Sequence, residues 1–590
     1  MIAAAVPAPD HLARLLAGLE AERQAVNRED AAMRALPLAH RVAAGAALAP
    51  LDIVTTEHRS RGRVNVLLRG KNLHDGITAG EPIILGPVGR PDGGIHGRFE
   101  GGDDHTVELR VDAAPEGKGP WAVVRRLDHH MLDLQRAALE RAGGKSSPLS
   151  SLLLGHERPY KPDPLDHPAL ASLNPAQRTA AATALGATEI GLIHGPPGTG
   201  KTQVLAAMLA VLVDLGERPW ALAESNAAVD QLALRAHAAG LDVVRIGVSA
   251  RVGSAALPLT LEHRILNGPR AGILQTLRKD RSRASGPALV EIDAAMREEW
   301  QAAKREILTN AQVLAMTIGS LQTRGADLPN PRTAVVDEAS QAWEPALWLV
   351  ASRVKRLLLA GDPMQLGPVV KSQHPALEKS LLARLVDEGF HFPMLTTQYR
   401  MCQVIQDAVS PMYQGRLVAD TSCASRIMDV NVSPWTDVPL RFVDTAGMGH
   451  DEEREDTGSY HNPGELDLVT RIVGELVAGG VTPDRIALVT PYAAQLGRLR
   501  ERHPDIEAGT VNAYQGREQD VVIATFVRSN ELQELGFVAD ARRLNVTVSR
   551  ARRLFIGIGD AGTLGVNPAF QALIDRTAAA GGYVSGWELG

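Results

Sequence analysis

The segment that most constrains the fold of this chain spans residues 195–202 and reads Gly-Pro-Pro-Gly-Thr-Gly-Lys-Thr. An apolar run at residues 190–193 precedes it, and a second apolar run at residues 204–212 follows it. A strand, a glycine-rich turn and a helix in this order form the context in which such a turn binds phosphate groups. The glycines let backbone N–H groups point inward, and the helix N-terminus adds positive potential. We therefore predict a P-loop that binds a nucleotide, rather than an ordinary glycine turn before a helix.

Each position of this loop has an expected role. Lys201 is expected to neutralise the β- and γ-phosphates of the nucleotide, and Thr202 is expected to hold Mg²⁺. The remaining positions are expected to surround the phosphates with backbone, and they are Gly195, Pro196, Pro197, Gly198, Thr199 and Gly200.

The composition indicates a globular protein of several domains. The chain has 590 residues, of which 45% are hydrophobic and 22% are charged, enough for roughly three or four domains. No uncharged apolar stretch approaches about 18 residues, and residues 1–10 lack the features of an export signal. The only cysteines, Cys402 and Cys423, exclude a disulfide scaffold and a four-cysteine zinc site, and they fit a reducing cytoplasm. The net charge of −6 counts against a passive nucleic-acid coat protein but permits a local basic groove.

Residues 1–145 are expected to form a knob on a two-helix stalk. Leucines at positions 12, 15, 16 and 19 share one face of a helix. Short strand candidates at residues 64–68, 82–85 and 107–111 lie between Gly- and Asp-rich turns and predict a small β-barrel. A second helix is expected at about residues 129–142, before two glycines. A proline-rich connector is expected at residues 146–170.

Strands and helices alternate through the rest of the chain, which predicts an α/β fold of parallel sheets with crossover helices. We expect one such domain at residues 171–390 and a second at residues 391–590. Residues 248–308 interrupt the alternation with charged helical sequence and are expected to form an inserted helical subdomain. The acidic run at residues 451–456 is expected to be a solvated loop rather than a functional one.

Two carboxylates end an apolar strand downstream of the P-loop. Asp337 is expected to bind Mg²⁺, and Glu338 is expected to orient and deprotonate the water that attacks the γ-phosphate. In isolation the pair would equally suit a turn cap, but its position after a P-loop favours the catalytic interpretation. Gln365 follows another apolar strand and is expected to sense the γ-phosphate, with an ordinary turn residue as the alternative.

Two arginines of the second predicted domain complete the expected catalytic set. Arg400 lies in the run Gln-Tyr-Arg-Met, and Arg550 lies in a run with several further arginines. Phosphoryl transfer spreads negative charge over the phosphate oxygens, which arginine offsets with paired hydrogen bonds. A site assembled from two domains opens and closes as the nucleotide binds and leaves, and this converts hydrolysis into movement. The alternative, arginines on an exposed surface, suits Arg552 and Arg553 better than Arg550.

The order of motifs along residues 174–560 resembles that of superfamily 1B helicases. The motifs are, in chain order, Gln177, GPPGTGKT, AESNAAVDQL, DEASQA, GDPMQLGPVV, TQYRM, TPYAAQ, TVNAYQGREQDVVIATFVRSN and RRLNVTVSRAR. The branch that they most resemble contains the nonsense-mediated-decay RNA helicase and the immunoglobulin-mu-binding-protein helicase. This resemblance implies two tandem RecA-like P-loop domains, an N-terminal stalk with a β-barrel, and an inserted helical subdomain. It also implies ATP hydrolysis with Mg²⁺ and 5′→3′ translocation along a single strand.

The resemblance assigns further roles to individual residues. Gln177 resembles the glutamine that reads adenine, Tyr399 the ring that stacks on the base, and Glu518 the acid that contacts the ribose. Other positions resemble strand contacts that suit phosphate and sugar rather than base edges, and they are Ser225, Asn226, Thr317, Pro491, Tyr492 and Thr510. Gln203 and Asn512 depart from the family pattern, which has a threonine and an aspartate at these positions. The change at Asn512 leaves open how its motif is coupled to the other motifs.

The sequence therefore predicts an ATP-dependent 5′→3′ helicase or translocase that acts on single-stranded or tailed duplex DNA or RNA. One alternative is an ATP-switched protein that binds nucleic acid or remodels ribonucleoprotein without processive unwinding, and another is a P-loop kinase or small-molecule transferase. The expected partners are nucleic acid and a recruiting protein, with no membrane, and the chain is expected to be a cytoplasmic monomer. The motifs do not separate DNA from RNA, because that choice depends on the space around the 2′-hydroxyl.

Overall fold

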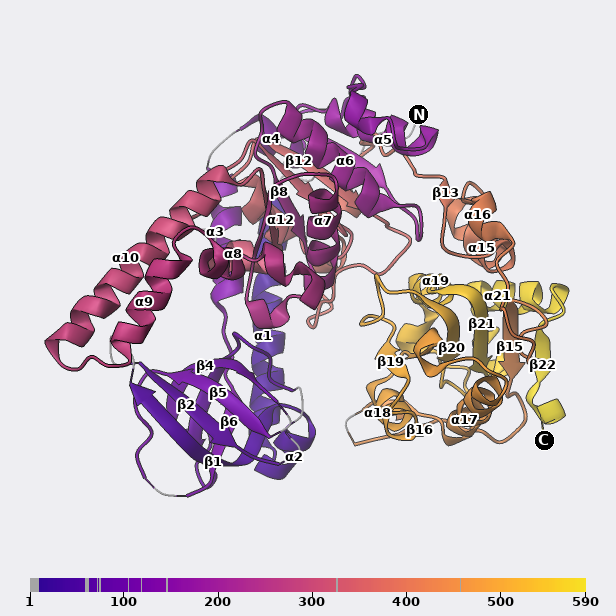
Figure 1. Ribbon diagram of the computed structural model, residues 1–590. Coiled ribbons are helices and arrows are strands. Elements are labelled where there is room, and N and C mark those ends of the chain that lie inside the picture. Colours follow the sequence, from indigo (N-terminus) through magenta and orange to yellow (C-terminus); the bar gives the residue numbers. More distant parts are fainter. Residues whose placement is uncertain are drawn as a thin grey trace.

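The computed structural model describes residues 10–58, 63–71, 73, 76–103, 105–117, 119–144, 147–324, 327–456 and 458–589. The predictions for the chain start at residues 1–9, and for the boundary between stalk and connector at residues 145–146, lie outside these ranges. The α/β class is confirmed, because the chain builds two six-stranded parallel sheets in addition to a barrel (Figure 1). Within the described ranges no helix is both long and apolar enough to cross a membrane.

Six antiparallel strands close into a barrel where the sequence predicted one, in the order β1-β2-β5-β4-β3-β6. Side chains alternate between its inside and outside, so Val64, Val66 and Leu68 of β2 are buried. Closure pairs the described strands on both sides and leaves no exposed sheet edge among them. The elements of this part are α1 (His11–Ala35), α2 (Leu38–Ala43), β1 (Ala47–His58), β2 (Val64–Arg69), β3 (Pro82–Pro87), β4 (Ile95–Gly102), β5 (Thr106–Val111), β6 (Trp121–Arg125) and α3 (His130–Ala142).

Helices α1 and α3 form a stalk that packs on the first α/β part. Leu15 and Leu19 of α1 and Leu139 of α3 are buried in one apolar cluster with residues of the first sheet. The segment at residues 146–170 differs from the plain connector expected, because it contains α4 (Pro148–Leu153). Three leucines of α4 join the same cluster, so this helix packs into the core.

The first α/β part carries a parallel sheet with the strand order β7-β12-β11-β8-β10-β9. An apolar cluster fills each of its two faces. All six strands end at the same edge of the sheet, which is where open α/β sheets bind their ligands. Its elements are α5 (Pro175–Leu185), β7 (Ile190–His194), α6 (Lys201–Asp214), β8 (Trp220–Ala223), α7 (Asn226–Ala238), β9 (Val243–Ile246), β10 (Val313–Thr317), α11 (Ile318–Arg324), β11 (Thr333–Val336), α12 (Glu344–Ala351), β12 (Arg356–Gly361), α13 (Pro375–Glu378) and α14 (Leu381–Asp387).

The segment between β9 and β10 is largely helical. It contains α8 (Leu261–Asn267), α9 (Ala271–Arg281) and α10 (Pro287–Asn310). Helices α9 and α10 form an arm that leaves the first α/β part and extends toward the barrel (Figure 1). Arg251, which precedes α8, donates to Thr78 Oγ1 of the barrel part at 2.8 Å, so the inserted segment and the barrel part are in contact.

The second α/β part carries a parallel sheet with the strand order β19-β18-β20-β21-β15-β22. It lies apart from the barrel, at the right of Figure 1. Its elements are β13 (Thr397–Gln398), α15 (Gln403–Val409), β14 (Val418–Ala419), α16 (Thr421–Ala424), β15 (Leu440–Asp444), β16 (Glu453–Arg454), β17 (Tyr460–His461), α17 (Pro463–Ala478), β18 (Ile486–Thr490), α18 (Ala493–Arg502), β19 (Glu507–Thr510), β20 (Gln519–Thr525), α19 (Ala541–Val548), β21 (Ala551–Gly559), α20 (Ala561–Leu564), α21 (Pro568–Ala579) and β22 (Tyr583–Ser585).

The acidic run at residues 451–456 is not a wholly solvated loop, and that prediction was wrong for Glu452. Its carboxylate accepts from Arg528 Nε at 2.8 Å and from the Ser529 N–H at 2.9 Å. The Glu452 side chain is only 11% exposed. The sequence did not reveal this ion pair, because its two partners are 76 residues apart.

A buried ion cluster ties the start of α1 to the first sheet. Glu344 of α12 accepts from Arg384 Nη2 at 2.8 Å, and His11 Nε2 lies 2.8 Å from the same carboxylate oxygen. Arg384 also donates to Glu388 at 2.6 Å. Burial disfavours the charged form of Glu344, but the charge of Arg384 and the contact with His11 outweigh burial and lower the Glu344 pKa to about 2.

Glu344→Gln should lower the free energy of unfolding of the first α/β part by about 3 kcal/mol at neutral pH, because Arg384 would stay buried beside a neutral amide. The folded pKa of about 2 lies below the ordinary 4.5. The contribution of the carboxylate is therefore fully present above the ordinary pKa and is lost as the pH falls toward the folded one. Urea unfolding followed by tryptophan fluorescence, at neutral pH and at about pH 3, measures this difference.

Asp467→Asn is the matched control, because Asp467 is 74% exposed in its pair with Arg502. It should cost less than about 1 kcal/mol. Equal losses in the two variants, or a loss for Glu344→Gln that does not shrink at low pH, would contradict the role given to Glu344.

Candidate functional site

The predicted P-loop connects β7 to α6 at the carboxyl edge of the first sheet. Gly198 and Gly200 have φ values of +73° and +75°, which residues with a Cβ rarely adopt. A Cβ on Gly198 would lie 2.6 Å from Arg400 Cβ, and one on Gly200 would lie 2.8 Å from Gln177 Nε2. Glycine therefore allows both the turn and the close approach of two other segments. The rest of the turn is formed by Gly195, Pro196, Pro197 and Thr199, whose hydroxyl donates to the Pro196 carbonyl at 2.7 Å.

Lys201 lies between the two predicted carboxylates. Its Nζ donates to Glu338 Oε1 at 2.6 Å and lies 3.5 Å from Asp337 Oδ1. Burial alone would lower the pKa of Lys201, but the charges of Glu338 and Asp337 outweigh it and raise the pKa to about 12. Glu338 has a φ of +51°, a strained conformation for a residue with a side chain. Gln341 donates to its second carboxylate oxygen at 3.2 Å and helps to fix the side chain.

Thr202 and Asp337 form a pair of oxygen ligands suited to Mg²⁺. Thr202 Oγ1 donates to Asp337 Oδ2 at 3.3 Å, and Asp337 is 2% exposed. Hydroxyl and carboxylate oxygens are the ligands that Mg²⁺ prefers, and this ion commonly takes few protein ligands beside phosphate and water. The two residues therefore fit the metal that the sequence predicted.

Both predicted arginines of the second α/β part reach the same side of the first part as the P-loop. We call this side the P-loop wall, and it is formed by residues 195–202 with Asp337, Glu338 and Gln365. Arg400 follows Tyr399, whose N–H donates to the Gly198 carbonyl at 2.8 Å. Arg550 is 1% exposed, and its Nη2 donates to Gln365 Oε1 of the first part at 3.4 Å. Burial, together with the nearby charge of Arg400, lowers the pKa of Arg550 to about 9. Neither arginine lies on the exposed surface that the alternative interpretation required.

A buried hydrogen-bond network that the sequence analysis missed joins the two parts beside Gln365. Asp362 Oδ2 accepts from Gln365 Nε2 at 2.8 Å and from the Tyr413 hydroxyl at 2.7 Å. Asn545 of α19 donates to the Tyr413 oxygen at 2.7 Å, and His194 of β7 lies 3.0 Å from Asp362 Oδ1. Asp362 lies in a run that the sequence analysis quoted, but no local pattern marks Tyr413 or Asn545.

The residues expected to contact the nucleoside border the same wall. Gln177 is buried, and its Nε2 donates to the Thr199 carbonyl at 2.9 Å. The Tyr399 hydroxyl accepts from Asn174 Nδ2 at 2.7 Å, which places the ring next to the helix that carries Gln177.

Glu518 has a different environment from the one expected of a ribose contact. One carboxylate oxygen accepts from Arg400, and the other accepts from Arg552 Nη2 at 2.6 Å. Burial would raise the pKa of Glu518, but the two guanidinium groups lower it to about 2. In this structure Glu518 therefore holds Arg400 in place.

The strand contacts predicted in the first α/β part lie together on the other half of the sheet edge. Thr317 at the end of β10 is in register with Ala223 at the end of β8, and Ser225 and Asn226 follow β8 after Glu224. Strands β8 and β10 are neighbours, whereas the P-loop and the two carboxylates follow β7 and β11. One edge of the sheet thus carries two separate groups of polar residues.

Several of these side chains already have partners within the chain. The hydroxyl of Ser225 caps α7, and Thr317 Oγ1 accepts from the Ser320 N–H at 3.0 Å. Asn226 Oδ1 accepts from the buried Arg245 at 2.8 Å. The amide oxygen of Asn226 is therefore occupied by the fold.

The strand contacts predicted in the second part lie at two neighbouring strand ends. Pro491 and Tyr492 follow β18, and Thr510 ends β19, which is in register with β18. The ring of Tyr492 lies 5.4 Å from that of Tyr460 and 4.8 Å from that of Phe537, measured between centroids. These rings border a hollow of about 580 Å³.

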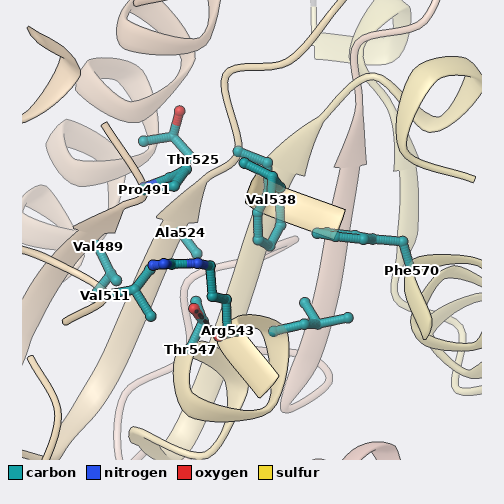
Figure 2. A pocket seen from close by; sticks show the side chains of 11 residues that line it. Val489, Pro491, Val511, Ala524, Thr525, Val538, Arg543, Thr547 and Phe570 are labelled. Carbon is teal, nitrogen blue, oxygen red and sulfur yellow. Dashed lines mark hydrogen bonds between the residues drawn. The ribbon is translucent and has the colours of Figure 1, made fainter. Parts of the chain in front are cut away.

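A small pocket lies beside Pro491 and is lined in part by residues of α19 (Figure 2). Arg543 of α19 extends across it toward Val511. Its Nη1 donates to Asn512 Oδ1 at 2.8 Å. The asparagine that departs from the family pattern therefore still contacts the helix that leads to Arg550.

Comparison with known proteins gives matches along most of the two α/β parts. One AAA domain family matches residues 172–294 and 288–373, and a second AAA domain family matches residues 377–562. The DNA-binding protein SMUBP-2 of Mesocricetus auratus is 35% identical over 468 residues, which are 73% of this chain and 47% of that protein. The ATP-dependent helicase upf1 of Schizosaccharomyces pombe is 33% identical over 465 residues, 72% of this chain and 50% of that protein. A solved complex of the arterivirus nonstructural protein 10 helicase with DNA aligns with 90% of this chain and 83% of its own, at 13% identity and a TM-score of 0.38.

This chain spans about half the length of the two curated relatives described above. The matches nevertheless cover the motifs from the P-loop to Arg550 in their order along the chain. The chain therefore belongs to the superfamily 1 helicases, in the branch that includes SMUBP-2 and upf1.

Proposed function

We propose that this chain is an ATP-dependent 5′→3′ helicase or translocase on single-stranded DNA or RNA. The contact that carries the proposal joins Arg550 of the second α/β part to Gln365 of the first. It brings a buried positive charge to the wall that carries Lys201 and Glu338, so hydrolysis requires the two parts together. A site shared in this way converts nucleotide turnover into relative movement.

The corresponding architecture is two tandem RecA-like domains with accessory parts. The domains comprise residues 171–390 and 391–590, and helical residues 248–308 are inserted in the first. Residues 1–145 form the stalk and barrel, and residues 146–170 link them to the first domain. The contact between Arg251 and Thr78 supports a role in which barrel and insertion act as one surface on the nucleic acid.

The P-loop wall supplies the groups that hydrolysis of ATP needs. Mg²⁺, held by Thr202 and Asp337, screens the phosphate charges when it is bound. Lys201 neutralises the β- and γ-phosphates, and Glu338 accepts a proton from the attacking water. The water oxygen bonds to the γ-phosphorus as the bond to the bridging oxygen breaks, which yields ADP and phosphate. Arg550 and Arg400 offset the charge that develops on the transferring group.

We assign binding of the adenosine to Gln177 of α5 and to Tyr399 and Glu518 of the second part. The buried amide of Gln177 reads the adenine edge, and the Tyr399 ring stacks on the base. Glu518 contacts the ribose through acceptor sites that remain on its carboxylate, which also accepts from Arg400 and Arg552. If a ribose hydroxyl displaces Arg400 from Glu518, that arginine becomes free for the phosphates.

The nucleic-acid strand is assigned to the polar residues that follow or end β8 and β10 in the first part and β18 and β19 in the second. Ser225, Thr317 and Thr510 present hydroxyls, and Asn226 presents its amide nitrogen. Pro491 and Tyr492 place backbone and ring at the end of β18. Contacts of these kinds hold phosphate and sugar without reading sequence.

The cellular setting that we propose is a monomer in the cytoplasm, directed to its substrate by a recruiting protein. Both cysteines are free and buried thiols, which fits a reducing compartment.

Lys201→Ala and Glu338→Gln should each abolish nucleic-acid-stimulated ATP hydrolysis, because the first removes the phosphate counter-charge and the second removes the base. Phosphate release with and without a single-stranded oligonucleotide measures the effect. Lys355→Ala and Glu501→Gln change the same residue types at exposed positions and should leave the rate within about twofold of wild type. Undiminished hydrolysis in both site variants would discard the proposed site.

Poly-dT and poly-U should both stimulate hydrolysis at a fixed salt concentration, with poly-dT slightly favoured, because backbone contacts dominate the strand path. Strand displacement on duplexes with a 5′ tail should exceed that on duplexes with a 3′ tail. Stimulation without displacement on either substrate would instead support an ATP-switched binding protein. Hydrolysis that ignores nucleic acid would support a kinase or transferase.

A further inference from the structure

A pocket of about 260 Å³ lies between the stalk and the first sheet. Helices α1 and α3 form one side of it, and α11, α12 and the residue after β8 form the other. None of the residues assigned above to ATP hydrolysis or to the strand path lines this pocket.

Two glutamines in this pocket have amide atoms without partners. Gln322 is 8% exposed, and neither its Nε2 nor its Oε1 makes a hydrogen bond within the part of the chain that the structure describes. Gln135 of α3 is 5% exposed, and its Oε1 lacks a partner by the same measure. Buried amides are normally satisfied, because an unpaired donor or acceptor costs free energy. The two side chains therefore point to a ligand that both donates and accepts hydrogen bonds.

The charges around the pocket exclude phosphate as this ligand. Glu22, Asp128 and Glu224 line it, and its described lining contains neither lysine nor arginine. Loss of solvent raises the pKa of the Glu224 carboxyl to about 7. A metal ion is not favoured either, since no cluster of three or more His, Cys, Asp or Glu able to hold one occurs among the described residues.

The remaining walls are apolar. Met131, Ile318 and Trp343 line the pocket. The indole N–H of Trp343 donates to the Val369 carbonyl at 3.0 Å, which fixes the ring. Apolar walls with a few amide groups suit a ligand that has hydrophobic faces and a polar edge.

Two residues that line the pocket are chain neighbours of residues in the proposed strand path. Glu224 directly precedes Ser225, and Ile318 directly follows Thr317. A strand held by Ser225 and Thr317 would therefore run close to residues that line the pocket.

We propose that this pocket binds one nucleobase turned out of the strand, with the Gln322 and Gln135 amides on its polar edge and Trp343 beside its ring. The site rests on the proposed function, since the base arrives on the strand that the chain moves along. Unstacked bases are commonly held in this way, between aromatic or apolar side chains and with hydrogen bonds to the edge.

The test compares the binding of a thymidine oligonucleotide with that of a strand of equal length whose bases have been removed. Both strands carry the same phosphates, so contacts to the backbone cancel in the comparison. The double variant Gln135→Leu/Gln322→Leu should bind the thymidine strand about tenfold more weakly than wild type. Its affinity for the strand without bases should not change. Fluorescence anisotropy at a fixed salt concentration gives both dissociation constants.

Gln24→Leu is the matched control, because Gln24 lies on α1 at an exposed position and does not line the pocket. It should bind both strands as wild type does. In the unaltered protein, light-induced cross-linking from 4-thiothymidine should mark a peptide that contains Met131, Ile318 or Trp343. This second readout does not depend on the folding of a variant.

A double variant that binds both strands as wild type does, with cross-links confined to other peptides, would show that the pocket does not bind a base and would overturn the inference. In that case nucleic-acid-stimulated hydrolysis by wild type would stay intact. Failure of the proposed function would look different, because wild type itself would then neither bind the strands nor respond to them.

Discussion

The buried guanidinium of Arg550 is the group on which our account of the two α/β parts depends, because it belongs to the second part and contacts the first. A charge at 1% exposure is costly unless it is neutralised or hydrogen-bonded. Backbone carbonyls of its own part hold two of its nitrogens, and Gln365 of the other part accepts from the third. The charge of Glu338 acts on it across the same interface. The negative charge of a triphosphate would complete this environment, which explains why such a cation is kept in a buried position.

The carboxyl edge of the first sheet carries two separate groups of polar residues. One group is assigned to the nucleotide and the other to the nucleic-acid strand. The P-loop and the carboxylates follow β7 and β11, and the proposed strand contacts follow β8 and β10. Because β8 lies directly beside β11, only one pair of neighbouring strands separates the two groups of residues. The hydrogen-bond network of Asp362, Tyr413 and Asn545 joins the first part to the second.

Local patterns in the sequence predicted the P-loop, both carboxylates and both arginines, because each of these follows a strand or a motif of recognisable spacing. The barrel was predicted from three of its six strands, and β1, β4 and β6 were missed. In β4, glycines and charged residues break the alternation. Its pairing comes instead from closure of the barrel. The contact of Tyr413 with Asn545 was missed because the two residues are 132 positions apart. Glu452 was misjudged for the same reason, since its partner Arg528 lies on a distant segment.

The distance between the two α/β parts, measured as the nucleotide is changed, tests the central claim most directly. Spin labels at Ala239→Cys and Ala478→Cys would sit at exposed positions of the first and second parts, away from the buried native thiols. With a non-hydrolysable ATP analogue and Mg²⁺, pulsed electron paramagnetic resonance should give one short, narrow distance. With ADP the distance should be longer or broader, and Lys201→Ala should remove the difference. The same distance distribution with both nucleotides would contradict a motor driven from a shared site.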